Sequence, residues 1–205
     1  MYTAQPMGNS PTQRDNQTRI GQMAKALAPN NRMQMIRVKS GDIDDRLDWI
    51  CFEINLGKRD ARVRQIAGAI LAKKGPGGDW EVPERNWEAE VAAIYWYVRN
   101  NVRYTRDIHE VELFQKPRRT LETKIADCDD LSILIGSLLQ TVGYPVILRV
   151  IGLGGNTYQH IFPMAGIPPD EPQRYIPLDA SRGEGPGWEV TDNVTLKTDY
   201  EVYNL

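Results

Sequence analysis

The chain has 205 residues, of which 41% are hydrophobic and 25% charged, as in an ordinary globular domain. Its net charge of −2 gives no electrostatic reason to expect a nucleic acid or an anionic membrane as a partner. No apolar run approaches the roughly 20 residues of a membrane-spanning helix, and the first residues lack the pattern of a signal peptide. Two cysteines, Cys51 and Cys128, make no disulfide framework, so we expect free thiols in a reducing, cytoplasmic compartment.

The N-terminal segment differs in composition from the rest of the chain. Residues 1–34 are polar and predict a flexible extension, whereas residues 35–205 predict a single domain. The alternative for the extension is an arm that becomes ordered against a partner chain. A short strand at 35–38 and a turn at 40–42 are expected where the domain begins.

Three amphipathic helices are predicted next, at 44–56, at 60–73 and from residue 83 or 86 to residue 101, because apolar side chains recur there at helical spacing. Cys51 lies on the apolar face of the first helix and is expected to be a buried structural thiol. Residues 105–120, with His109 and Pro117, lack such a pattern and predict an irregular segment.

A fourth helix, which begins at Cys128 and has Gly143 as its expected C-cap, is apolar on most sides and is therefore expected to be buried. Asp127 and Asp129 suit its cap and first turn. Cys128 thus stands at a helix N-terminus, where a thiolate can be stabilised. The negative charges of Asp127, Asp129 and Asp130 oppose this effect, because they raise the pKa of a nearby thiol.

The last third of the chain predicts strands. They are expected at 146–151, 158–163 and 174–178, with a glycine-rich turn at 152–156, a proline-rich loop at 165–173 and a further strand near 194–196. Helices followed by antiparallel strands indicate an α+β fold.

Three residues form a candidate catalytic constellation. Adjacent antiparallel strands can place His160 beside Asp179, and packing of the fourth helix on that sheet would bring Cys128 to the imidazole. Thiol acyl transfer needs this set of nucleophile, base and orienting carboxylate. The alternatives are a buried cysteine, a core histidine and an aspartate that caps a turn. For the oxyanion, the backbone N–H of Cys128 or the amide of Gln115 could donate.

Four sequence blocks within 95–182 resemble the transglutaminase-like superfamily, a papain-related group of cysteine acyltransferases and peptidases. The blocks are 97–104, 120–130, 158–162 and 177–181. The resemblance implies N-terminal helices and a central cysteine-bearing helix packed on an antiparallel sheet. It implies that Cys128 is the nucleophile, that His160 is the general base and acid, and that Asp179 orients His160. It implies no metal and no cofactor, and the spacing of the aspartates fits no metal motif.

The chain departs from the family pattern at three positions. Ala126 stands where glycine is usual before the Asp-Cys pair, Phe162 where tryptophan is usual, and Ala180 where proline follows the aspartate. None of these changes removes a member of the triad. Ala126 is the departure that would alter how a substrate approaches the thiol.

The front half also resembles a branch of this family encoded by tailed bacteriophages and prophages, through residues 41–42, 58–60 and 120–122. The first hypothesis is therefore a phage-encoded cysteine enzyme that hydrolyses peptide or protein amides. The alternative is a virion structural or assembly protein that retains the fold with little or no activity. In that case the N-terminal arm would contact other virion proteins. These hypotheses place the protein in the cytoplasm of a bacterial host or in the virion.

Overall fold

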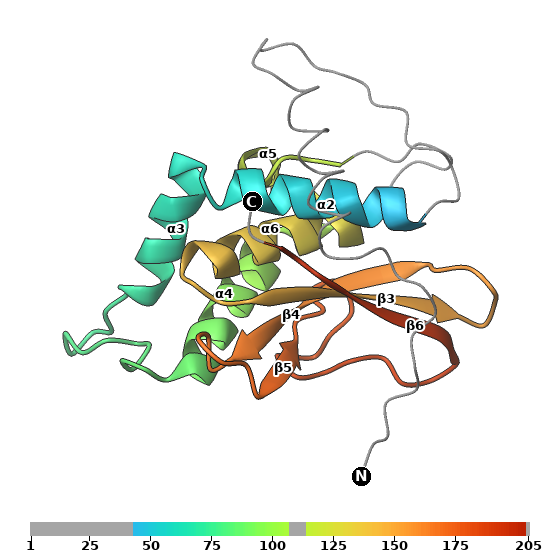
Figure 1. The fold of residues 1–205 in the computed structure, drawn as a ribbon. Coiled ribbons are helices and arrows are strands. Elements are labelled where there is room, and N and C mark those ends of the chain that lie inside the picture. Colours follow the sequence, from blue (N-terminus) through green and yellow to red (C-terminus); the bar gives the residue numbers. More distant parts are fainter. Residues whose placement is uncertain (1–42, 107–113, 204–205) are drawn as a thin grey trace.

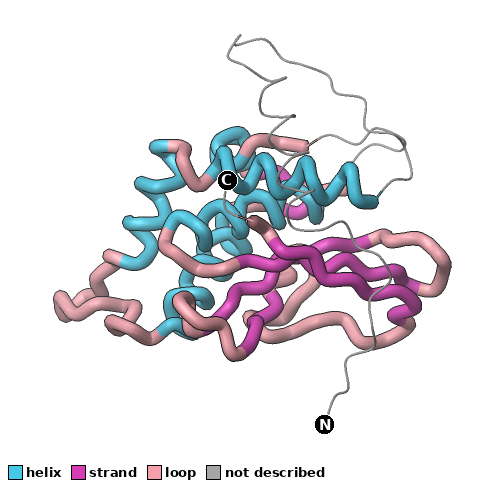
Figure 2. Tube along the Cα trace, viewed as in Figure 1, coloured by secondary structure: helices cyan, strands magenta, loops and turns pink. Residues whose placement is uncertain are grey.

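The computed structural model describes residues 43–106 and 114–203. The expected N-terminal extension, the strand at 35–38, the turn at 40–42 and His109 lie outside the described residues. Within them, a layer of helices covers one face of an antiparallel sheet (Figures 1 and 2). The α+β fold class expected from the order of helices and strands is confirmed.

Within the described residues, the predicted helices and strands appear in the expected order, and α5, β1 and β2 are additional to them. The helices are α2 (Ile43–Gly57), α3 (Ala61–Leu71), α4 (Trp87–Asn101), α5 (Pro117–Thr123) and α6 (Cys128–Thr141). The strands are β1 (Arg103–Tyr104), β2 (Ile125–Ala126), β3 (Val146–Leu153), β4 (His160–Ile167), β5 (Arg174–Pro177) and β6 (Val194–Glu201).

Helix α6 is the centre of the core, as its apolar composition predicts. It contacts each of the other four described helices as well as β3 and β4. The carboxylate of Asp127 caps the helix by accepting the N–H of Asp130 at 2.9 Å. The helix ends before Gly143, whose φ of +94° lies in the left-handed region that only glycine adopts at little cost.

The main sheet has the strand order β5-β4-β3-β6, and every pairing in it is antiparallel. Its register decides where the candidate site lies. His160 begins β4 opposite Ile151 of β3, and Met164 pairs with Pro177 near the end of β5. Continued past β5, this register brings Asp179 level with Phe162, one diagonal step from His160.

Three strands extend further than their sequences predict. β3 continues to Leu153, two residues into the expected glycine-rich turn. β4 continues to Ile167, through residues expected in a loop, because these residues pair with β5. Gly166 leaves room for Pro172, since a Cβ there would lie 2.9 Å from the proline Cγ. β6 runs for eight residues instead of the three at 194–196, and it pairs with β3 along nearly its whole length.

Two helices also differ from prediction. Residues 117–120, in the segment that was expected to be irregular, belong to α5, with Pro117 in the first turn, where its fixed φ and missing N–H are tolerated. α3 begins at Ala61 because Asp60 is its N-cap, accepting the N–H groups of Arg62 and Val63 at 2.8 and 3.2 Å. It ends at Leu71, two residues before the expected end.

Candidate active site

A short parallel ladder holds the segment that precedes the thiol. β1 pairs with β2, and the N–H of Thr105 donates to the carbonyl of Ala126 at 2.8 Å. The ladder fixes the segment that leads into Cys128, the first residue of α6. Ala126 is 1% exposed, so the methyl group that departs from the family pattern points into the core.

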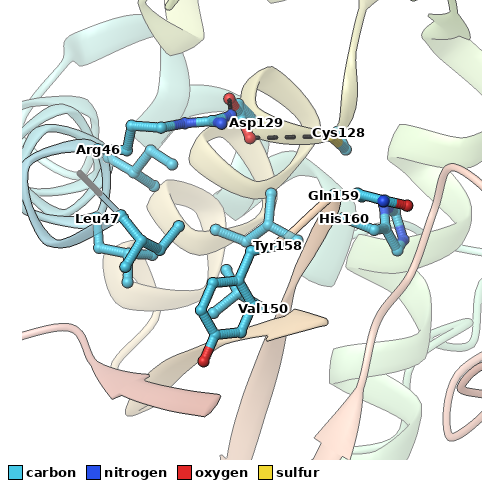
Figure 3. Close-up of a pocket in the computed structure, with 11 residues that line it drawn as sticks. Arg46, Leu47, Cys128, Asp129, Val150, Tyr158, Gln159 and His160 are labelled. Atoms are coloured by element: carbon cyan, nitrogen blue, oxygen red, sulfur yellow. Dashed lines mark hydrogen bonds and ion pairs between the residues drawn. The ribbon is translucent and has the colours of Figure 1, made fainter. Parts of the chain in front are cut away.

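The thiol of Cys128 lies among carboxylates. Its Sγ donates to Oδ1 of Asp129 at 3.8 Å (Figure 3). Burial, Asp129 and Asp127 raise the pKa of this thiol well above its ordinary value. The backbone N–H of Ile161 and the charge of Arg46 oppose the increase without cancelling it. The direction agrees with the expectation that the acidic flanks disfavour a thiolate.

His160 and Asp179 form the close pair that adjacent strands were expected to produce. His160 Nε2 and Asp179 Oδ2 are 2.6 Å apart, and both side chains are almost fully buried. An ionised carboxylate can only accept a hydrogen bond, so Nε2 carries the proton and Nδ1 of the neutral ring carries the lone pair. The pair therefore fixes the ring orientation and the tautomer of a potential base.

Asp179 is surrounded by hydrogen-bond donors. Burial raises its pKa, but hydrogen bonds from His160, Ser181 and the N–H of Arg182 outweigh burial, so its pKa lies below the ordinary value. The Ser181 hydroxyl donates to Oδ1 at 2.7 Å, and the two backbone N–H groups of residues 181 and 182 donate to the same oxygen at 3.1 and 3.2 Å. Asp179 is thus a carboxylate at neutral pH.

Helix α4 holds the turn that carries Asp179, a role that sequence analysis missed. The hydroxyl of Tyr95 donates to the carbonyl of Gly183 at 3.0 Å. Arg99, one helical turn later, donates to the carbonyl of Ala180. In the sequence, Tyr95 is one of the apolar residues that predict this helix. That pattern does not indicate that its hydroxyl binds a residue more than 80 positions away.

Gln115 does not occupy the role of oxyanion donor that the sequence suggested. Its Nε2 donates to Oδ2 of Asp130 at 2.6 Å and to the carbonyl of Ile125 at 3.2 Å, which uses both of its N–H groups. Its backbone N–H donates to the other oxygen of Asp130 at 2.7 Å. Gln115 and Asp130 therefore connect the segment before α5 to the first turn of α6.

Cys128 and His160 line one small pocket, together with side chains of α2 and β3 and with the residues before β4 (Figure 3). The cavity volume is about 20 Å³, which holds roughly one water molecule. Among the described residues, no hydrogen bond joins the thiol to the imidazole, and the thiol donates to Asp129 instead. Such catalytic contacts are often long in the absence of substrate.

Other kinds of site are not apparent in the part of the chain that the structure describes. It contains no cluster of three or more His, Cys, Asp or Glu side chains that could hold a metal ion. Within 43–106 and 114–203, no helix is both long and apolar enough to cross a membrane.

Comparison with known proteins supports the assignment of the fold. Residues 81–180 match the model of the transglutaminase-like superfamily, so this part of the chain is similar to that family. A search of curated proteins gave no match.

Two solved structures are similar to the chain. A proposed cysteine protease from Cytophaga hutchinsonii has 18% identity and a TM-score of 0.45 over 74% of this chain and 47% of its own. A proposed protease from Parabacteroides distasonis has 12% identity and a TM-score of 0.47 over 76% of this chain and 30% of its own. The chain therefore spans less than half the length of either protein.

Proposed function

We propose that the protein is a thiol-dependent enzyme that hydrolyses peptide or protein amides. In this proposal Cys128 is the nucleophile, His160 the general base and acid, and Asp179 the residue that orients His160. The observation that carries it is the 2.6 Å His160–Asp179 hydrogen bond, in the same pocket as a thiol at the start of the central helix. That combination suits nucleophilic catalysis better than it suits a packed core.

The chemistry follows from the tautomer of His160. Nδ1 of the imidazole takes the thiol proton, and the sulfur attacks the carbonyl carbon of the amide. The imidazolium then returns its proton to the leaving amine, which leaves a thioester on Cys128. Water, deprotonated by the same imidazole, attacks the thioester and releases the carboxylic acid. Asp179 stabilises the imidazolium throughout, because it is ionised and its second oxygen is held by three donors.

The oxyanion of the tetrahedral intermediate has a candidate donor in the backbone N–H of Cys128. The first N–H groups of a helix have no acceptor within the helix, and the helix dipole is positive at that end. The Gln115 amide is excluded from this role by its bonds to Asp130 and Ile125. Hydrolysis is proposed over cross-linking because water is always present, whereas no described feature marks a second site for an amine.

A second function is favoured by a different observation, the raised pKa of the Cys128 thiol. A thiol that stays protonated suits a protein that retains the fold without the activity. This candidate is a phage virion structural or assembly protein. The resemblance to the phage-encoded branch supports it, with the N-terminal arm as the contact to other virion proteins.

Alkylation of Cys128 by iodoacetamide as a function of pH separates the two functions. The labelled peptide is identified by mass spectrometry, because Cys51 is the other thiol. For the enzyme, the pH midpoint of labelling lies below that of a free cysteine, about 8.5. The midpoint should rise in His160→Ala. A midpoint above that of free cysteine, unchanged in His160→Ala, would refute the enzyme and favour the structural protein.

A catalytic assay completes the test. Wild-type protein incubated with unfolded casein should release peptides or ammonia, and Cys128→Ala should release neither. Addition of a fluorescent primary amine separates cross-linking from hydrolysis, because only cross-linking incorporates the amine into protein. Detection of the chain in purified phage particles would support a virion location, which is compatible with either function.

A further inference from the structure

The two carboxylate oxygens of Asp129 have different partners. Oδ1 accepts the thiol of Cys128 at 3.8 Å, and Oδ2 accepts Nη2 of Arg46, on α2, at 2.8 Å. Asp129 is 2% exposed, whereas the Arg46 side chain is 29% exposed. A buried carboxylate therefore lies between the thiol and a cation that reaches it from another helix.

Each partner changes the protonation of the thiol in a direction that the geometry fixes. The carboxylate of Asp129 accepts the S–H proton and repels a thiolate, so it stabilises the neutral thiol. The guanidinium of Arg46 withdraws charge from the same carboxylate and attracts a thiolate. Because Arg46 binds the oxygen that faces away from the sulfur, it acts on the thiol without occupying the thiol's own acceptor.

We infer that Asp129 and Arg46 form a charge pair that sets how readily Cys128 loses its proton: Asp129 retains the proton on the sulfur, and Arg46 weakens that retention. Neither residue takes part in bond making. Both act through Cys128. The effect on the thiol is independent of catalysis, and only its consequence for turnover rests on the proposed function.

Other charged and titratable groups face the thiol from the elements around it. From α6, Asp127 adds negative charge, but its Oδ1 is bound by the N–H of Asp130. From the β1 side, Tyr104 interacts with Cys128, and Arg106 with Tyr104. Burial and the charge of Cys128 raise the pKa of the Tyr104 phenol, so it is neutral near pH 7.

From β4, His160 lines the same pocket as the thiol and is the proposed acceptor of its proton. Among the described residues, Asp129 is the one side chain that accepts a hydrogen bond from the sulfur. A single substitution at Asp129 or Arg46 should therefore change the protonation of the Cys128 thiol more than a substitution elsewhere around it.

The charge pair matters most at the moment of activation. When the thiol proton moves to Nδ1 of His160, the sulfur becomes negative beside the negative Asp129. Arg46 and the N–H of Ile161 are then the groups that compensate this charge on the sulfur side. Loss of Arg46 leaves two adjacent anions with less compensation, and loss of the Asp129 charge leaves the thiolate beside a cation.

The experiment measures the pH midpoint of iodoacetamide labelling at Cys128 in four variants. Asp129→Asn should lower the midpoint by roughly one unit or more, and Arg46→Gln should raise it by roughly one unit. Arg46→Lys, which keeps the charge, should stay within about half a unit of wild type. The double variant Arg46→Gln/Asp129→Asn, which removes both charges, should return toward the wild-type value.

The midpoint responds to charge, whereas a purely structural role would not give shifts of opposite sign or recovery in the double variant. Near-ultraviolet circular dichroism identifies variants that fail to fold, and Arg46→Gln tests the inference if Asp129→Asn does not fold. Shifts in the same direction for the two single variants, or no shift in Arg46→Gln, would overturn the inference. His160→Ala, measured alongside, tests the proposed function separately: opposite shifts without a histidine effect would support the charge pair and refute the triad.

Discussion

Asp179 and Cys128 are two buried acids in the same site, and their surroundings act on them in opposite directions. Burial is the largest influence on both, and it raises the pKa of each. Around Asp179 the neighbours are donors, and its pKa falls below the ordinary value. Around Cys128 the neighbours are carboxylates, and its pKa rises well above it. The comparison shows that burial alone does not decide which group is ionised: the donors around Asp179 outweigh the effect of burial, whereas the carboxylates around Cys128 add to it.

Asp179→Asn tests whether the ionised carboxylate of Asp179 is needed for turnover. Of the substitutions that test this comparison, it has the largest expected effect. The amide keeps the shape of the carboxylate but loses the charge that stabilises the imidazolium. We expect turnover of any amide that the wild type cleaves to fall by roughly 100- to 10,000-fold. The labelling midpoint of Cys128 should rise as well. Asp170→Asn, in an exposed loop, is the matched control and should leave both quantities unchanged.

Glu53→Gln extends the comparison to a buried acid with one oxygen that no described group donates to. Glu53, on α2, is 3% exposed, and its Oε2 has no hydrogen-bond partner among the described residues. Burial raises its pKa to about 7, against a smaller lowering effect of Lys116. Between its ordinary value of 4.5 and about 7 the folded state binds more protons than the unfolded state, so stability falls as the pH rises.

Glu53→Gln removes this loss of stability at high pH, because the amide does not ionise. At pH 8 we expect Glu53→Gln to be more stable than wild type by on the order of 2–3 kcal/mol, with less pH dependence between about 4.5 and 7. Urea unfolding at a series of pH values measures both effects. Glu84→Gln is the control, because that side chain is 90% exposed. A glutamine variant that is less stable than wild type at pH 8 would contradict the account of Glu53.

Ser181→Ala removes one hydrogen-bond donor from Asp179. The pKa of Asp179 should therefore rise, although less than that of Cys128. The hydroxyl donates at 2.7 Å, and its loss costs about 1 kcal/mol of stability at neutral pH. The lowered pKa of Asp179 stabilises the fold above the unfolded-state pKa, and this contribution is lost as the pH falls through the folded-state value. Acid unfolding, followed by tryptophan fluorescence, should therefore begin at higher pH in Ser181→Ala. Ser181→Thr keeps the hydroxyl and should restore wild-type behaviour.

Tyr95→Phe makes the smallest change, because it acts on the turn that carries Asp179 and not on the carboxylate. Loss of the 3.0 Å hydrogen bond to Gly183 should cost about 1 kcal/mol and lower turnover a few-fold. Thermal unfolding and the amide assay measure these effects. Tyr97→Phe on the same helix is the control. An equal effect in both variants would show that the hydroxyl of Tyr95 has no specific role.

The features that sequence analysis predicted correctly are those encoded by local patterns. Apolar spacing predicted α2, α4 and α6, and the β-branched run predicted β3. The proximity of His160 and Asp179 followed from expecting two neighbouring antiparallel strands, although the register that realises it is visible only in the structure. Residues 105–120 predicted an irregular segment, whereas Pro117 begins a helix of seven residues, which is too short for a periodic pattern to emerge.

The features that were missed depend on partners far away in the sequence. β6 alternates exposed polar side chains with half-buried ones, and it is a strand because β3 provides its hydrogen bonds. The contact of Arg46 with Asp129 joins residues separated by 83 positions. No local sequence pattern indicates such a contact. The sequence therefore predicted the effect of the adjacent aspartates on the thiol, but not the effect of Arg46.

The parallel pairing of β1 with β2 has a consequence for how this protein can diversify. It fixes the two ends of the segment between Thr105 and Lys124 directly beside the cysteine, through bonds from Arg103 to Lys124 and from Thr105 to Ala126. A loop whose ends are anchored can change length cheaply, since each doubling costs only about 0.6 kcal/mol in closure entropy. An insertion between these two anchored ends would therefore leave Cys128 in place, because the hydrogen bonds that position it lie outside the inserted residues.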